Sequence, residues 1–257
     1  MSDAAPRKVK LGAVLAAILR VLADRSFLVQ ALPIPFAMMF AAEWVLHAIP
    51  STIVAFAALI AIAIAGASLA VRTHRHILLH ENPSATSLGG PEWSYLGRVF
   101  VLYLPVFASA LGFFALYVLF AGRAFIASPT SHPIWELYAV PVFIFVVVPL
   151  LVGGLILPAM LALPALAIGR DQFGEKDSRA AVKGNRLRIL ALAAIVWLVP
   201  EIPIFALAWV AGQFIAASIV AIALLDAIAA ALGGILFAAL LSIVYAGLVE
   251  EKPEFTG

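Results

Sequence analysis

The sequence predicts an all-α integral membrane protein with six transmembrane helices, and three observations carry this prediction. The 257 residues are 65% hydrophobic and only 12% charged, with a mean hydropathy of +1.11. Soluble domains carry about 25% charged residues, so this chain has too little charge to cover a water-facing surface. Six apolar stretches are long enough to cross a bilayer as helices, which takes about 20 residues each. The basic residues collect on one side of these stretches.

The six predicted spans pair into three hairpins of one membrane domain, residues 1–257. The expected spans are Leu28–Ile49, Thr52–Val71, Val99–Ala121, Leu137–Leu161, Ile189–Ala211 and Ala227–Val249. The segments between and around the hairpins 28–71, 99–161 and 189–249 are 1–27, 72–98, 162–188 and 250–257. These segments are short, so we expect no separate catalytic domain.

The limits of two spans are left open by the sequence. The chain is apolar from Phe214 to Val249, which is longer than one span needs. We favour an interfacial stretch over 213–226 that leads into a span beginning at Ala227, and one long tilted helix is the alternative. The fourth apolar region contains prolines that could bend it or end it early, namely Pro141, Pro149, Pro158 and Pro164.

The distribution of lysine and arginine predicts the orientation. All 16 basic residues except Arg123 fall in the segments on one side of the predicted spans. Short loops rich in lysine and arginine stay in the cytoplasm. Both termini are therefore expected in the cytoplasm, which requires an even number of spans.

Three cytoplasmic stretches that precede spans are predicted to lie in the membrane interface. In residues 10–24, one helical face is apolar and carries Leu11, Val14, Leu15, Ile18 and Leu22. Such a pattern favours a helix that lies in the interface with its apolar side in the acyl region. The stretches "EWSYLGR" and "EKDSRAAVKGNRLR" occupy equivalent positions before spans three and five. The chain therefore reads as three similar units, which suggests a pseudo-threefold bundle.

Composition excludes several classes of site. The net charge of +2 is too small to indicate a nucleic-acid partner. The absence of cysteine excludes disulfides, iron–sulfur clusters and thiolate zinc sites. The sequence has no glycine-rich phosphate loop and no nucleophile with an adjacent base, so we predict no enzyme and no cofactor. Arg20 interrupts the first apolar run, which we therefore expect to remain in the mature protein.

Two segments resemble a group of uncharacterised bacterial six-helix membrane proteins. The segments are "THRHILLHE", residues 73–81, and "LALPALAIGRDQFGEKDSRAAVKGNRLRIL", residues 161–190. They are similar to YciC-like proteins and to the membrane domain attached to some glycerophosphodiester phosphodiesterases. The matching positions are His74, Arg75, Leu78, Leu79, Glu81, Pro164, Ala165, Ala167, Ala180, Gly184 and Asn185. The resemblance implies a six-helix fold in a bacterial inner membrane and implies no activity.

The first of these segments carries a candidate interfacial cluster. His74, Arg75 and Glu81 belong to the resemblance, and we expect Arg75 and Glu81 to pair with groups at the cytoplasmic end of the bundle. Arg72, Arg75 and the nearby histidines are also placed to meet anionic headgroups. His76 and His80 are four residues apart and share a helical face, which is a workable metal pair. We predict no metal there, because neither histidine belongs to the resemblance.

A second pair of titratable residues lies near the opposite end of the first span. Glu43 and His47 are at i and i+4, with Trp44 between them as an expected interface anchor. A proton-handling or ion pair is one interpretation. The one we prefer is a pair solvated by the headgroup layer.

The third candidate is an intramembrane polar site formed by Glu201, Pro200 and Pro203. Glu201 lies about 18 Å from the start of span five at a rise of 1.5 Å per residue, which is near mid-membrane. Ionisable groups at that depth usually face a bundle interior or a water-filled cavity. The prolines free backbone carbonyls one turn earlier, and Glu201 could bond to them or handle a cation or proton. Asp226 would be a second buried acid if span six began before it.

The predicted function is a non-catalytic role in organising the envelope or a membrane complex, through lipids, a protein partner or a second copy of the chain. The alternative is a small ion-coupled carrier that uses Glu201. A third hypothesis, an intramembrane enzyme that uses His74 and Glu81, lacks a recognisable catalytic arrangement.

Overall fold

The computed structural model describes residues 8–82, 89–120, 148–214 and 219–256. Within these ranges the chain is helical, with one isolated bridge between Val9 and Thr256 and no named strand. The prediction of an all-α fold is therefore confirmed for the described residues. The helices are α1 Leu11–Ala23, α2 Arg25–Ala31, α3 Pro33–Ala48, α4 Thr52–Leu79, α5 Gly90–Phe120, α8 Val148–Met160, α9 Ala162–Ala167, α10 Glu175–Ala181, α11 Arg186–Phe214 and α12 Ile219–Leu248.

Three helices in the described ranges are long and apolar enough to cross a membrane. They are α4, the Arg186–Ile204 part of α11, and α12. The pair α2 and α3 adds a fourth candidate if it counts as one span bent by 53°. These helices support the interpretation that the chain is a membrane protein. The number of six spans remains a prediction. The predicted fourth span, Leu137–Leu161, begins outside the described residues. Pro141, one of the prolines in that span, also lies outside them.

The break between α2 and α3 has a local cause. Pro33 and Pro35 stand at the start of α3, and a proline has no amide hydrogen to donate to the carbonyl four residues earlier. The carbonyls of Val29 and Ala31 therefore lose their helical partners. Proline also restricts the residue before it, which is Leu32 at the bend.

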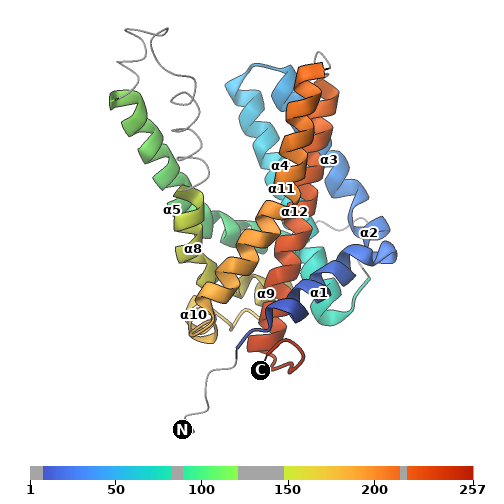
Figure 1. Ribbon diagram of the computed structural model, residues 1–257, viewed down its shortest axis with the longest axis vertical. Coiled ribbons are helices and arrows are strands. Elements are labelled where there is room, and N and C mark those ends of the chain that lie inside the picture. The colour runs from blue at the N-terminus through green and yellow to red at the C-terminus, as the bar shows by residue number, and fades with distance from the viewer. Residues whose placement is uncertain (1–7, 83–88, 121–147, 215–218, 257) are drawn as a thin grey trace.

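The last helix is the centre of the bundle and begins earlier than the favoured span. α12 is continuous from Ile219 to Leu248, so no helix break separates the predicted interfacial stretch from a span at Ala227, as the alternative of one long helix expects. α12 packs against α1, α3, α4, α9 and α11, and Figure 1 shows it beside α4 and α11 along the long axis. Small buried residues such as Ala231 and Ala239 let helices approach closely within a membrane.

The amphipathic first helix also differs from the prediction. Val14 and Ile18 on its apolar face are buried in the main core, and α1 packs against α12. The apolar face therefore contacts the protein through Val14 and Ile18, while Leu11 on the same face is 41% exposed. The stretch "EWSYLGR" forms the first turns of α5 instead of a separate helix. The third stretch does form a short helix, α10, before α11.

The two ends of the described chain are held together at one end of the bundle, which we call the terminal end (Figure 1). The Lys10 amide donates to the Phe255 carbonyl at 2.9 Å. The Val9 amide donates to Asn185 Oδ1 at 2.9 Å, and Arg188 donates to the Val9 carbonyl at 2.9 Å. The opposite end, where α3 ends and α12 begins, is the distal end. The membrane side that each end faces remains a prediction.

Asp24 caps α2, which yields a first testable prediction. Its carboxylate accepts from the hydroxyl of Ser26 at 2.7 Å and from the amides of Ser26 and Phe27 at 3.0 and 3.1 Å. Replacing such a cap with alanine costs about 1 kcal/mol, so we expect Asp24→Ala to lower the unfolding free energy by that amount. Asp24→Asn should keep most of the cap. Chemical unfolding of the purified protein measures both variants, and an unchanged Asp24→Ala protein would contradict the prediction.

The same cap predicts a dependence on pH. The Ser26 hydroxyl, followed by the Phe27 amide, holds the pKa of Asp24 below its usual value of 3.8. A carboxyl with a lowered folded-state pKa contributes stability that is fully present above its unfolded value and is lost as pH falls through the folded one. The contribution of this cap, measured as the stability difference between wild type and Asp24→Asn, should therefore shrink as the pH falls below about 4.

Candidate functional site

Three titratable side chains from two helices converge at the distal end. Glu43 and His47 come from the last turns of α3, and Asp226 comes from the second turn of α12. One ligand-capable atom of each lies within 4.8 Å of the others. His47 Nε2 lies 2.9 Å from Asp226 Oδ2. We call these three residues the distal cluster.

The helical spacing accounts for two of the three residues in the distal cluster, and helix packing accounts for the third. Glu43 and His47 are four residues apart, so they share one face of α3. The other helix that supplies a ligand, α12, packs along α3. Because α12 begins at Ile219, Asp226 is helical and faces this pair. The favoured prediction places Asp226 at the interface and identifies no partner for its carboxylate. In the structure that partner is His47.

Glu201 extends the cluster toward the middle of the bundle. Asp226 is close enough to act electrostatically on the Glu201 carboxyl, which is half-buried on α11. Within the described ranges this carboxyl forms no hydrogen bond, so the expected bond to carbonyls freed by proline is not found. Pro200 is buried and Pro203 is exposed, and α11 continues through both.

The distal end carries an excess of acidic groups among the described residues. Glu43 and Asp226 lie beside a single imidazole, His47, and Glu201 is a third acid near Asp226. No lysine or arginine lies on α3, on α12 or on α11 beyond Arg188. One imidazole nitrogen with two or three carboxylate oxygens is a ligand set that suits divalent metal ions such as Zn²⁺, and it can also hold a proton. The arrangement therefore favours a cation.

A separate polar network is buried at the terminal end. His74 is fully buried, with Nδ1 2.7 Å from Ser242 Oγ and Nε2 3.0 Å from Tyr95 Oη. Ser242 donates its only hydroxyl hydrogen to the Ala238 carbonyl at 2.9 Å. Its oxygen must therefore accept from His74 Nδ1–H, which leaves Nε2 to accept from the Tyr95 hydroxyl. The network joins α4, α5 and α12.

The predicted interfacial cluster is therefore divided. Arg75 and Glu81 form an exposed two-bond ion pair, with distances of 2.8 Å and 3.1 Å, and His74 is separate from them in the interior. Arg72 is also buried, at 6% exposure, so it does not reach headgroups as predicted. It donates to the Ala31 carbonyl at 3.1 Å.

The candidate metal pair does not fit the positions of its histidines. His76 Nε2 lies 3.2 Å from Asp24 Oδ2, and Nδ1 lies 3.2 Å from the Glu81 carbonyl. The ring also stacks on Phe27 with centroids 4.4 Å apart. Both nitrogens are engaged, so His76 has none to share with His80, which ends α4 in the left-handed conformation.

No family model, curated protein or solved structure matches the chain.

Proposed function

We propose that this chain is a six-span protein of the bacterial inner membrane, with both termini in the cytoplasm, and that it acts as an ion-coupled carrier. The observation that carries the proposal is the convergence of Glu43, His47 and Asp226 within 4.8 Å, on helices that are otherwise apolar. Ionisable groups in membrane helices are costly and usually mark ion pathways or binding sites. The role favoured by the sequence, organisation of the envelope without transport, needs no such group of residues.

The distal cluster is the proposed loading site for the cation. Its ligands come from two helices, α3 and α12, so binding a cation draws these helices together. Glu201 lies deeper on α11, by about 9 Å if the ends of α11 and α12 are level at 1.5 Å per residue. It is the next acid along the bundle and is flanked by prolines, where helices bend most readily. Cation transfer from the distal cluster to Glu201 is the proposed first step inward. The protein itself performs no covalent chemistry.

Transport into liposomes tests this proposal. Purified protein is reconstituted in vesicles that contain a Zn²⁺ indicator and a pH-sensitive dye, and Zn²⁺ or an acid pulse is added outside. We expect wild-type protein to raise the initial rate of Zn²⁺ or proton entry above that of protein-free vesicles. Asp226→Asn and Glu201→Gln should each lower that rate at least tenfold, because each removes a negative charge that the cation must meet.

Glu81→Gln is the matched control, since it neutralises an acid that is paired at the terminal end. It should transport at the wild-type rate. Wild-type vesicles that equal protein-free vesicles in both readouts would rule out a Zn²⁺ or proton carrier. Full transport by Asp226→Asn would show that the distal cluster is not the loading site. A Glu201→Gln protein that keeps its flux but loses a co-purifying partner would favour the organising role.

A further inference from the structure

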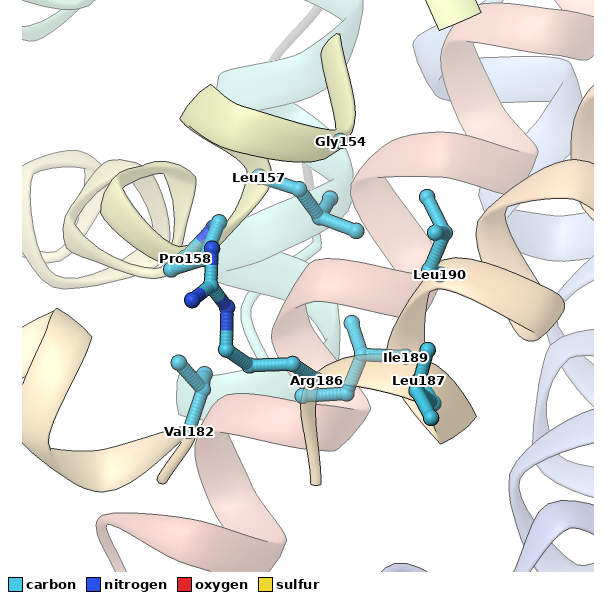
Figure 2. Close-up of a pocket in the computed structure, with 8 residues that line it drawn as sticks. All are labelled: Gly154, Leu157, Pro158, Val182, Arg186, Leu187, Ile189 and Leu190. Carbon is cyan, nitrogen blue, oxygen red and sulfur yellow. The ribbon is translucent and has the colours of Figure 1, made fainter. Parts of the chain in front are cut away.

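A groove at the terminal end lies between α8, α10 and α11 (Figure 2). Its cavity volume is about 320 Å³, and its walls are mainly apolar, from Leu157, Pro158, Val182, Ile189 and Leu190. Arg186 is the one charged residue among those that line it. Figure 2 shows the Arg186 side chain extending into the groove toward Pro158. Such a groove can bind an apolar group along its walls and an anion at the guanidinium.

The Arg186 guanidinium has no partner among the described residues. Two other arginines at this end are paired: Arg98 with Glu175 at 3.3 Å, and Arg170 with Glu250 at 2.8 Å. No hydrogen bond or ion pair joins Arg186 to any residue in the described ranges. Guanidinium groups form two parallel hydrogen bonds to phosphate oxygens, so Arg186 is free to bind one.

The position of the groove relative to the membrane decides which phosphate fits. Arg186 is the first residue of α11, at the start of the candidate span Arg186–Ile204. The border between headgroups and hydrocarbon therefore falls near Arg186. Leu187, the next residue, is 81% exposed, as expected of a side chain that faces lipid. A molecule with a phosphate at one end and an acyl chain behind it matches this position.

We infer that this groove is a specific site for an anionic phospholipid. The phosphodiester of the lipid binds the Arg186 guanidinium, and one acyl chain lies against Leu157, Ile189 and Leu190. Lys183, exposed one turn earlier, adds to the positive potential that attracts anionic headgroups. The inference does not rest on the proposed carrier function, because the groove lies at the opposite end of α11 from the distal cluster.

A glycine keeps the groove open. A β-carbon built at Gly154 on α8 would lie 3.3 Å from Leu190 Cδ1. A larger side chain at this position would therefore occupy the space between α8 and α11. Gly154→Leu is thus a variant that blocks the acyl part of the site, whereas Arg186→Gln removes only the charge.

Native mass spectrometry of the full chain in detergent, titrated with phosphatidylglycerol or phosphatidylcholine, tests the inference. We expect wild-type protein to bind one phosphatidylglycerol with an affinity at least tenfold above that for phosphatidylcholine. Arg186→Gln should remove most of this preference by weakening phosphatidylglycerol binding more than phosphatidylcholine binding, because both lipids have a phosphodiester but the choline cation of phosphatidylcholine offsets its charge. Gly154→Leu should weaken the binding of both lipids.

Arg179→Gln is the control, because Arg179 is exposed on α10 and does not line the groove. It should bind phosphatidylglycerol as wild type does. The inference is wrong if Arg186→Gln keeps the full preference, if Arg179→Gln loses as much of it, or if wild type does not distinguish the two lipids. A bound protein that excludes phosphatidylglycerol from wild type would assign the groove to a protein partner instead. Arg186 is exposed, so its replacement should fold, and the thermal transition of each variant checks this.

Discussion

Replacing Arg72 with methionine is expected to lower the free energy of unfolding by about 3–5 kcal/mol, because a buried carbonyl loses its charged donor and a buried carboxylate loses a neighbouring cation. Arg72 lies near the end of α4 and is 6% exposed. Its guanidinium donates to the Ala31 carbonyl at 3.1 Å and interacts electrostatically with buried Glu92. The Ala31 carbonyl is the one left without a helical partner by Pro35. Arg72 therefore holds the bent pair α2 and α3 against α4.

The adjacent arginine on the same helix provides the control for this prediction. Arg75 forms an ion pair with Glu81 in which the side chains are 36% and 45% exposed, and such pairs contribute about 1 kcal/mol or less. In thermal unfolding, Arg72→Met should lower the midpoint by about 6–20 °C, at 2–4 °C per kcal/mol for a chain of this size. Arg75→Met should leave it nearly unchanged. Equal midpoints for the two variants would show that burial does not distinguish them.

The double variant Arg72→Met, Glu92→Gln shows how much of the stability lost in Arg72→Met comes from the missing charge and how much from lost packing. Glu92 also accepts from the Gly89 amide at 2.9 Å, so glutamine keeps an acceptor there. If the cost of Arg72→Met comes partly from leaving a buried carboxylate without its cation, the double variant should recover part of the lost stability.

His74→Phe is expected to have the second largest effect, a loss of about 3 kcal/mol. The Tyr95 hydroxyl would lose its acceptor and Ser242 Oγ would lose its donor, both within the core, and each buried polar group left without a partner costs about 1–3 kcal/mol. Phenylalanine is also a poor fit in a site shaped for imidazole. Thermal unfolding followed by circular dichroism measures the change.

The triple variant His74→Phe, Tyr95→Phe, Ser242→Ala is the test of the mechanism. It removes all three polar groups together, and replacing both partners of a hydrogen bond with apolar groups can be nearly neutral. We therefore expect the triple variant to be more stable than His74→Phe alone. If it is less stable, the loss comes from volume rather than from unpaired hydrogen bonds.

The parts of the fold that follow from local pattern were predictable from the sequence. Apolar length and the low charge identify α4, α11 and α12 as candidate membrane helices. The spacing of Glu43 and His47 places them on one face, and the depth of Glu201 identifies it as unusual. Each of these inferences uses only residues within about one helical segment.

The parts that depend on helix register could not be predicted. The apolar stretch from Phe214 to Val249 contains no mark of where lipid ends, so Asp226 had no fixed place and no visible partner. His74, Tyr95 and Ser242 lie on three helices, and nothing in their own segments links them. One pattern in the sequence did indicate a role for a residue such as Arg72. Pro33 and Pro35 leave two backbone carbonyls, those of Val29 and Ala31, without a helical donor. That pattern indicates a missing donor without identifying it.

The hydrogen bonds around Val9 impose an order on assembly. Val9 is made before its partners Asn185 and Thr256 and the neighbouring Phe255, which follow much later in the chain. At about 5–20 residues per second, the interval between Val9 and Thr256 is on the order of ten to fifty seconds. Until these partners have been made, the first segment of the chain cannot form its hydrogen bonds to them. Its contacts with Phe255 and Thr256 therefore form only after the final helix has been translated and has packed into the bundle.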